Sequence, residues 1–392
     1  MKPGYSIHEM TDRLFDPCEI LTVCSSLVVY SETTGEMRLG HYSVKEYLVS
    51  ERIKKGSAAT FHLMEASAHI SIAEICCTYL LSFNKLESLI SQPLSNFPLL
   101  DYAAKNWYNH ARMVQTGSQN TADTMSFRIL DATRNLSFHN WLRVFQPDRQ
   151  WYGQKMQLDL AEIGPPLYYA SHLGLPETVR LQLENGADAN VVGGYYGSPL
   201  QAAALRGYEK IVRLLLNQGA KVNSQGGEYG NALQAAFVGN HEHLISLLIE
   251  HGADVNAQGG YYGNALQAAL TRSLPEYVPK LIELGADVNA QGGQFGNALQ
   301  AASRYWHENA VEQLIERGTD VNASGGYYGN ALQAASRGGS EKIVWLLLEK
   351  GAHVNARGGS FGSALNAAKS SRNWNVLQIL LEWGADESVL DE

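Results

Sequence analysis

Cysteine is scarce in this sequence, and the few cysteines present are not spaced to hold a metal ion. They stand at positions 18, 24, 76 and 77. No two of them form a C-x-x-C pair, and His41, His69 and His110 lie too far apart to complete a ligand set. A structural zinc site needs four such ligands at short spacings. We therefore expect no metal site, and we expect Cys76 and Cys77 to be buried free thiols in a reducing compartment.

Long hydrophobic stretches are also missing. The longest apolar stretch runs from Ile70 to Phe83, and Glu74 interrupts it. A membrane-spanning helix needs about 20 apolar residues, so we expect no membrane partner. The opening residues, MKPGYSIHEM, contain no apolar core of a signal peptide. These absences predict a cytoplasmic location, with the nucleus as the alternative.

Motifs of catalysis and cofactor binding are absent as well. The sequence contains no G-x-x-x-x-G-K-[ST] loop, no H-E-x-x-H motif and no EF-hand loop. Glycine pairs recur at 226, 259 and 292, but none opens a longer helix, as a phosphate-binding loop would. We therefore expect no enzymatic activity, no catalytic residues and no bound cofactor.

Basic charge is in deficit, since 30 lysine and arginine residues face 39 acidic residues and the net charge is −9. The acidic surplus lies mainly in the C-terminal part. A chain of this charge does not track a phosphate backbone through bulk electrostatics, which disfavours nucleic acid as a partner. With 45% hydrophobic residues the chain can nevertheless bury a core, so it is expected to be folded.

A block of 33 residues recurs through the C-terminal part without insertions. Its GADVN-like segment begins at Gly186, Gly219, Gly252, Gly285, Gly318, Gly351 and Gly384. Each block contains an NALQAA-like segment, a break that often holds glycine (Gly207, Gly339), and a second apolar helix such as EKIVWLLLEK. One such unit cannot cover its own apolar face, whereas stacked units can.

The ends of these predicted helices carry recognisable signals. Asparagine or serine opens each first helix as an N-cap, and Gly351 is placed to end a second helix in the left-handed conformation. The VNARGGSFG segment that follows has the composition of a hairpin-like turn. In the fourth block Pro275 and Pro279 interrupt the pattern, so we expect a distortion there.

The period, the helix–turn–helix unit and the GADVNA ending resemble the ankyrin repeat over residues 165–388. The resemblance implies a mainly α solenoid of about seven repeats with β-hairpin fingers. The opening departs from the family pattern T-P-L-H and reads N-A-L-Q here. The glutamines at this place are Gln201, Gln234, Gln267, Gln300 and Gln333. Their amides can still donate and accept hydrogen bonds, as the histidine of the family does.

Two rows of side chains could contact a partner protein. The first row is Tyr196, Tyr229, Tyr262, Phe295, Tyr328 and Phe361, with Tyr195, Tyr261 and Tyr327 immediately before three of them. The second row, at the ends of the first helices, is Arg206, Arg272, Arg304 and Arg337. The aromatic row could pack between hairpins or supply contact anchors, and the preceding position is expected to be more exposed. The arginines could be solvated charge or line a groove for an acidic or aromatic-bearing segment.

The N-terminal third has a different pattern. We expect a partial winged-helix-like segment over 1–56, a helical region over 57–146 and a connector over 147–164, followed by the repeats over 165–392. The segments RLFDPCEIL, SSLVVYSETTGEMRLGHYSVKEYL, AEICCTYLLSF and FPLLDYAAKNWYNHA resemble the region that follows the nucleotide-binding module of fungal NACHT–ankyrin proteins. In that family a NACHT ATPase precedes this region. No phosphate-binding loop is present here, so no ATPase residues are carried over, and the resemblance implies a C-terminal portion.

Three functions follow from these patterns. The first is a scaffold or sensor that binds another protein through the concave and finger face of the repeats. The second is the regulatory C-terminal half of a NACHT-type signalling ATPase, which would make such a module a partner. The third is DNA binding by the winged-helix-like segment, although its basic residues alternate with Glu46 and Glu51.

Overall fold

The structure is a computed structural model of the full chain. It describes residues 28–31, 36–39, 65–84, 97, 99–114, 121–131, 136–149, 163–272 and 274–390. The chain forms two compact units, Met1–Ile72 and Ala73–Glu392. The four segments proposed from the sequence stay predictions.

In the first unit the described residues form an antiparallel hairpin of β1 (Val28–Ser31) and β2 (Glu36–Leu39), with Val28 opposite Leu39 and Ser31 opposite Glu36. The sequence predicted two strands around a turn here. The helices of the winged-helix-like interpretation lie outside the described residues, so that interpretation stays a prediction.

The N-terminal helices of the second unit surround an aromatic core. They are the later part of α5 (Glu65–Ser82), α6 (Leu100–Met113), α7 (Thr121–Ile129) and α8 (Ser137–Val144). The rings of Trp107 and Trp141 meet edge to face at 5.6 Å, and Trp141 Nε1 donates to the carbonyl of Ala104 at 2.9 Å. Cys76 and Cys77 are free and buried, as predicted, and burial raises the pKa of Cys76 to about 11.

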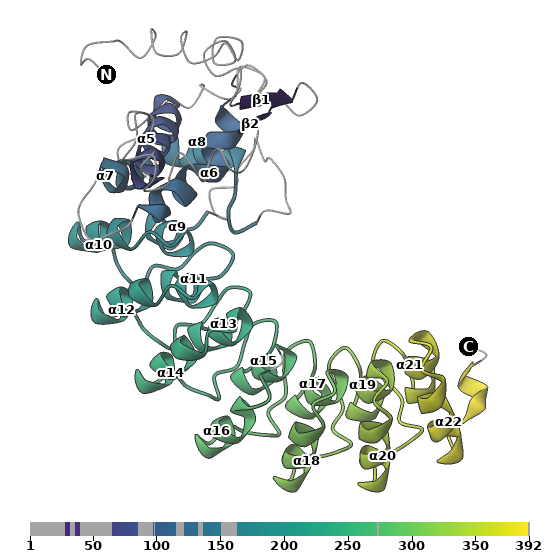
Figure 1. Ribbon diagram of the computed structural model, residues 1–392. Helices are drawn as coiled ribbons and strands as arrows, with labels where there is room; N and C mark the ends of the chain where they lie inside the picture. Colours follow the sequence, from purple (N-terminus) through teal and green to yellow (C-terminus); the bar gives the residue numbers. More distant parts are fainter. Residues whose placement is uncertain are drawn as a thin grey trace, which may run out of the picture. The chain divides into compact units, whose positions relative to one another are not determined.

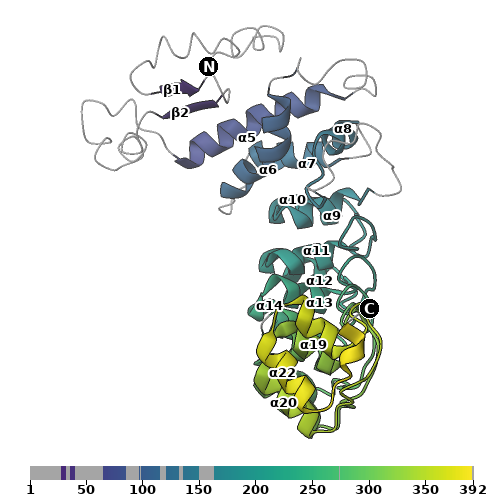
Figure 2. The same cartoon turned by 90° about the vertical axis from the view of Figure 1, so that its right-hand side faces the viewer.

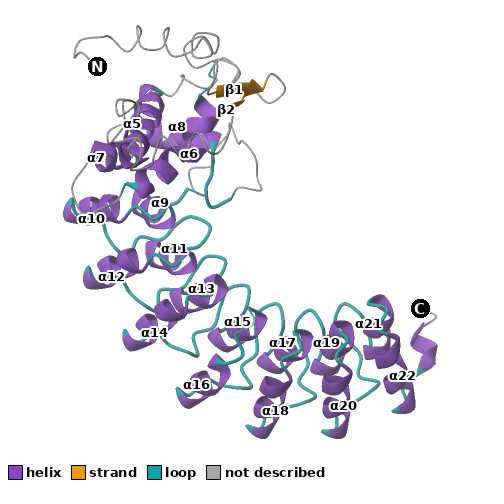
Figure 3. Ribbon diagram, in the orientation of Figure 1, coloured by secondary structure: helices purple, strands orange, loops and turns teal. Residues whose placement is uncertain are grey.

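The rest of the second unit is an array of helix pairs. The first helices are α9 (Pro166–His172), α11 (Pro199–Arg206), α13 (Ala232–Gly239), α15 (Ala265–Thr271), α17 (Ala298–Arg304), α19 (Ala331–Gly338) and α21 (Ala364–Ser370). The second helices are α10 (Pro176–Glu184), α12 (Glu209–Asn217), α14 (Glu242–Glu250), α16 (Tyr277–Glu283), α18 (Glu308–Glu316), α20 (Glu341–Glu349) and α22 (Trp374–Glu382), and the 3-10 helix η5 (Glu387–Leu390) follows. Figure 1 shows the two sets as two parallel rows, and Figure 3 shows the loops between them.

The N-terminal helices pack directly on the first pair. Phe138 and Trp141 of α8 contact the ring of Tyr169 in α9 at 5.7 and 5.9 Å. Gln182 of α10 donates to the carbonyl of Leu130, just after α7, at 3.1 Å. Figures 1 and 2 show α7 and α8 beside α10 and α9 in both views. The first pair is therefore covered by the N-terminal helices on its free side.

The predicted helix signals are confirmed. The side chain of Asn264 accepts a hydrogen bond from the amide of Gln267 at 2.9 Å, and the cap residues of the other first helices from α11 to α21 make the same bond. Gly351 adopts φ 87°, the left-handed conformation expected at the end of a helix. The leucines and alanines of the LQAA segments, such as Leu266 and Ala268, are buried.

A row of asparagines clips each helix pair to the next. Asn256 Nδ2 donates to the carbonyl of Gly285 at 2.7 Å, and its Oδ1 accepts from the amide of Asp287 at 2.8 Å. The same pair of bonds is made by Asn190, Asn223, Asn289, Asn322 and Asn355. One amide side chain thereby satisfies two backbone groups of the following repeat, which fixes the spacing between pairs.

The fourth pair is distorted where the prolines fall. Helix α16 begins at Tyr277, two residues after Pro275, and has 7 residues, whereas α14 and α18 have 9. Pro279 lies in the first turn of α16, where its missing N–H costs no intrahelical bond. The irregularity predicted for this block is confirmed as a late start and a shortened second helix.

The β-hairpins predicted for the fingers are not formed as regular paired strands. Among the described residues 163–272 and 274–390 no strand is formed, and the fingers are closed by single bridges such as the one between Gly259 and Gly263. The loop between the bridged glycines is too short to pair further residues. Its other backbone groups bond to the neighbouring fingers instead, as described below.

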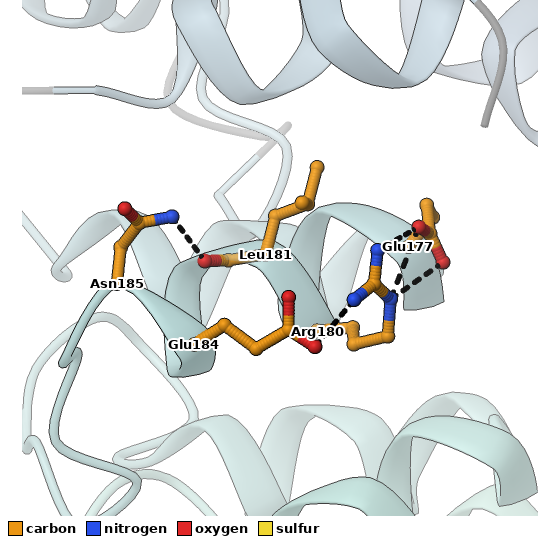
Figure 4. A network of polar contacts seen from close by, with 5 residues as sticks. All are labelled: Glu177, Arg180, Leu181, Glu184 and Asn185. Atoms are coloured by element: carbon orange, nitrogen blue, oxygen red, sulfur yellow. Dashed lines mark hydrogen bonds and ion pairs between the residues drawn. The ribbon is translucent and has the colours of Figure 1, made fainter.

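Ion pairs between side chains of the same helix stabilise the exposed side of α10. Arg180 donates from Nε to both carboxylate oxygens of Glu177, at 3.0 and 3.1 Å, and also contacts Glu184 (Figure 4). Asn185 donates to the carbonyl of Leu181 at 2.7 Å and ends the helix. These i,i+3 and i,i+4 pairs stabilise the helix locally and leave this arginine fully engaged.

Candidate protein-binding surface

The loops before the first helices, here called the fingers, are joined side by side through their backbones. The amide of Tyr261 donates to the carbonyl of Glu228 at 2.7 Å, and the amide of Gln294 donates to the carbonyl of Tyr261 at 2.9 Å. The same bond joins successive fingers from Tyr195 to Ser360. Equivalent side chains of neighbouring fingers are thereby held in one register.

The close approach of the fingers requires glycine. Gly260 has φ 67°, and a Cβ atom there would lie 2.3 Å from the backbone nitrogen of Gly230 in the preceding finger. A side chain at this position would force the two fingers apart. The recurring glycine pairs therefore serve the contact between fingers.

The aromatic row forms a continuous stack along the fingers. Its members are Tyr196, Tyr229, Tyr262, Phe295, Tyr328 and Phe361. Neighbouring ring centroids lie 5.7–6.4 Å apart, with ring planes within 23° of parallel. His172 extends the stack beyond Tyr196 at 5.4 Å. Tyr196 and Phe295 are buried and the other members half-buried, so these rings pack the fingers together.

The position before each stacked ring is more accessible. Tyr261 and Tyr327 are 43% and 44% exposed, and their rings stand edge-on to Tyr262 and Tyr328 at 5.0 and 5.1 Å. Tyr195 is less exposed than these two. Partial burial of Tyr195, and then the Glu228 carboxylate, raise the pKa of Tyr195 to about 12. Its hydroxyl is therefore protonated at neutral pH.

The arginine row lies against the aromatic row, so the structure unites the two candidate stripes. Arg304 Nε donates to the hydroxyl of Tyr328 at 2.9 Å, and its guanidinium lies 5.8 Å from the centre of that ring. The guanidinium of Arg337 lies 5.6 Å from the ring of Phe361. These contacts hold planar cations over aromatic faces, the arrangement of a cation–π pair.

The other two arginines use part of their donors on the array itself. Arg272 Nε donates to the carbonyl of Val238 at 2.9 Å, and an amino group of Arg206 lies 3.1 Å from His172 Nε2. Burial raises the pKa of Tyr262, and the positive charge of Arg272 opposes that rise. The hydroxyl of Tyr262 is therefore neutral at neutral pH and can donate a hydrogen bond.

Two exposed aromatic residues beside the arginine row were not predicted from the sequence as partner contacts. Tyr305 contacts the ring of Phe295 at 5.7 Å and the guanidinium of Arg304 at 5.5 Å. Trp306 is 62% exposed and has φ 65°, while Nε1 donates to the carbonyl of Gly338 at 2.9 Å. The signal was available, because Trp306 occupies the break position that holds Gly339 one period later. A large residue in this conformation marks a candidate functional position.

The glutamines at the family's histidine position serve the fingers. Gln201 Nε2 donates to the carbonyls of Gly226 and Gly230 at 2.8 and 3.0 Å. Gln234 and Gln333 each donate to an alanine carbonyl at 3.3 Å. These three amides donate as their chemistry predicted, whereas the buried amides of Gln267 and Gln300 have no hydrogen-bond partner in the described part of the chain.

The described part of the chain offers no group of three histidine, cysteine, aspartate or glutamate side chains that could hold a metal ion. Among the same residues, no helix has both the length and the apolar character needed to cross a membrane. The candidate surface is therefore described by its aromatic and arginine side chains alone.

Comparison with known proteins places the array in a family. The family model for ankyrin repeats in three copies matches residues 158–226, 266–358 and 299–391, and a single ankyrin-repeat model matches 231–260. A crystal structure of the human ASB11 ankyrin repeat domain is similar over 56% of this chain and 98% of that domain, with 27% identity and a TM-score of 0.45.

A curated relative comes from Monascus ruber. Its azaphilone pigments biosynthesis cluster protein L is 36% identical over 188 residues, which cover 45% of this chain and 39% of the relative. The chain therefore matches well under half of that relative's length. The family models together match more than half of the chain, and the chain belongs to the ankyrin-repeat family.

Proposed function

We propose that the chain is a scaffold or sensor that binds another protein through its finger face. The finger face is Tyr195, Tyr261, Tyr327, Arg206, Arg272, Arg304, Arg337 and Tyr305, with the edge of the stacked aromatic row. Ankyrin repeats generally mediate protein–protein interactions. We also propose that the array comprises seven repeats, one for each helix pair from α9/α10 to α21/α22.

One observation carries this proposal: exposed aromatic rings and arginines lie together on a backbone that hydrogen bonds hold in register. Tyrosine, tryptophan and arginine dominate the binding energy of protein interfaces. Because the fingers are fixed to one another, ordering Tyr261 and Tyr327 on binding costs little conformational entropy. The arginines favour a partner segment that carries carboxylates or aromatic rings, since guanidinium groups bond the former and stack on the latter.

Site-specific photocrosslinking tests this surface. A photoreactive amino acid at Tyr261 or at Tyr327 should trap the same protein in cells that express the chain. The matched control is Leu284, which is similarly exposed at 45% but lies at the end of α16. Equal trapping of that protein from Leu284 would contradict the finger face.

Charge reversal provides the second arm of the test. The variant with Arg272, Arg304 and Arg337 all changed to Glu should lose the trapped partner, because its carboxylates would meet like charge. Arg213→Glu is the control, since Arg213 lies on α12 and pairs with Glu209 of its own helix at 2.8 Å. Unchanged capture by the triple variant, with an unchanged circular dichroism spectrum, would contradict the proposal.

A regulatory role is the second candidate. We propose as the alternative that this chain is the C-terminal portion of a NACHT-type signalling protein and restrains or senses its ATPase. The packing of α7 and α8 on the first repeat supports it, because a signal at the array could pass to helices that precede it. An upstream phosphate-binding loop in the full-length transcript would favour this role.

The chain is also proposed to have no enzymatic activity. It is proposed to act in the cytoplasm or nucleus, and imaging of the tagged chain would test this location. The hairpin β1–β2 is proposed to belong to a winged-helix-like segment. DNA binding by that segment is the weakest alternative, and duplex binding that falls steeply with salt would be needed to support it.

A further inference from the structure

A polar cavity of about 190 Å³ lies where α6 meets the first two repeats. Helix α6 contributes Tyr108, Asn109 and Arg112, and the ends of α9 and α11 contribute His172 and Arg206. Tyr208, the residue before α12, closes the wall. All of these residues belong to the second compact unit.

The cavity contains two guanidinium groups and no carboxylate among its described lining residues. Arg112 donates to the hydroxyl of Tyr208 at 2.7 Å and to Asn109 Oδ1 at 3.2 Å. Among the described residues, the hydrogen-bond partner of the Arg206 side chain is His172 Nε2, at 3.1 Å. Arginine has five N–H donors, so each group keeps several donors for a further acceptor.

Two other arginines of the array are neutralised by carboxylates of their own helices. Arg180 pairs with Glu177 and Glu184, and Arg213 pairs with Glu209. In the described part of the chain neither Arg112 nor Arg206 has such an ion pair. Two like charges that share a cavity repel each other, and an anion between them would replace that repulsion with attraction.

Neither His172 nor Tyr108 adds a negative charge to the lining. His172 is buried, and burial together with the charge of Arg206 lowers its pKa to about 3, so its ring carries no charge at neutral pH. Burial raises the pKa of Tyr108, and the positive charges of Arg112 and Arg206 oppose that rise. Both charges are therefore felt at the Tyr108 hydroxyl. The hydroxyl of Tyr208 accepts from Arg112 and keeps its own proton to donate.

We propose that this cavity binds a phosphate group, held between the guanidinium groups of Arg112 and Arg206 and hydrogen-bonded by Tyr208. A phosphate monoester carries about −1.5 to −2 charges at pH 7 and three acceptor oxygens. That charge matches two arginines, whereas a carboxylate would neutralise only one. The site shares Arg206 with the finger face but contains none of its exposed tyrosines. Failure to bind phosphate would therefore leave the partner contacts of Tyr261 and Tyr327 untouched.

Calorimetric titration of the full chain with inorganic phosphate tests the site. We expect one bound phosphate, and we expect Arg112→Gln to weaken its binding about tenfold or more, because a charge-assisted hydrogen bond and one charge are lost. Arg112→Lys should give intermediate binding, since it keeps the charge without the planar fork. Arg112 is exposed, so these variants are expected to fold, and their melting temperatures without phosphate check this.

The control variant is Arg213→Gln, which removes one positive charge from neighbouring α12 outside the cavity. Absence of heat with the wild-type chain, or equal weakening by Arg213→Gln and Arg112→Gln, would overturn the proposal. Loss of binding in Arg206→Gln as well would support it.

A peptide arm identifies the source of the phosphate. The probe is a short glycine and alanine peptide with one central phosphoserine, and its unphosphorylated twin is the control. Tighter binding of the phosphopeptide than of inorganic phosphate, abolished in Arg112→Gln, assigns the site to a phosphorylated protein. Binding of inorganic phosphate alone, with the same dependence on Arg112, assigns it to the free anion.

Discussion

The N-terminal helices and the repeat array build their cores differently. Between α6 and α8 the core depends on single large side chains, with Trp107 and Trp141 edge to face at 5.6 Å. In the array, one leucine and several alanines are buried at equivalent positions of successive repeats. A unique contact has no substitute in the neighbouring structure, whereas a repeated contact is one of many similar interfaces. Substitutions in the two regions should therefore differ in size and in how far their effect spreads.

The largest effect is expected in the N-terminal core. Trp141 is 1% exposed and contacts Trp107, Phe138 and Tyr169. Trp141→Ala should lower the free energy of unfolding by about 3–5 kcal/mol, because it leaves a cavity and an unpaired carbonyl at Ala104. Chemical denaturation with circular dichroism measures it. A loss below that of the array variant described next would contradict the contrast between unique and repeated contacts.

A central leucine of the array is expected to have the next largest effect. Leu266 is 1% exposed in α15, the first helix of the distorted fourth pair. Leu266→Ala should cost about 2–5 kcal/mol, and the array should begin to unfold at this point. Hydrogen exchange followed by mass spectrometry should show lost protection in α15 and α17 before α7 and α8. Unchanged thermal denaturation would count against the register of the repeats.

Acid should destabilise the junction between the regions. His172 has its pKa lowered to about 3 in the folded chain, against about 6.5 in an unfolded one. The unfolded state therefore binds the proton first, so stability falls as the pH drops below 6.5. Between pH 6.5 and 5 the loss should be about 2 kcal/mol. His172→Asn should reduce the slope of stability against pH in denaturation curves recorded across this range, and an unaltered slope would contradict the assignment.

The asparagine clips should contribute less. Asn256→Ala removes two hydrogen bonds to the next repeat and should lower stability by about 1 kcal/mol, because the exposed backbone groups regain water. Asn185→Ala is the matched control, since that amide bonds only to the carbonyl of Leu181 in its own helix. Equal losses from the two substitutions would show that the clip between repeats adds nothing.

The smallest change in stability is expected at Trp306. Asn240 occupies the equivalent break position with φ 60°, so asparagine fits this backbone. Trp306→Asn should raise stability by about 0.5 kcal/mol, since the gain in backbone preference is partly offset by the lost bond to Gly338. Because Trp306 directly follows Tyr305 of the finger face, capture of the partner should also fall in the crosslinking assay. A large loss of stability would instead make Trp306 a packing residue.

Sequence periodicity anticipated much of the array because its signals are local. Asn264 caps α15 through a bond three residues away, and Gly351 adopts the positive φ that ends α20. The accessible position of Tyr261 also followed from its alternation in the sequence. The partner-binding role of the two rows stays a prediction.

Other features escaped because they join residues that are distant in sequence. The asparagine clips bridge 29 and 31 residues, and no single repeat reveals their acceptors. Arg112 and Tyr208 meet across 96 residues of chain with no shared motif. The fingers differ from the predicted hairpins because their backbone groups bond to adjacent fingers, which exist only once the repeats are stacked.

The sequence by itself determined the period, the helix pairs, their caps and the glycines of the turns, since each depends on side chains within a few residues of one another. Only the tertiary structure decided that Arg304 lies on the ring of Tyr328, and that Arg112 and Arg206 line one cavity. Contacts of this kind depend on how whole elements pack. Burial and backbone bonding between neighbouring repeats supply that geometry, and no local pattern encodes it.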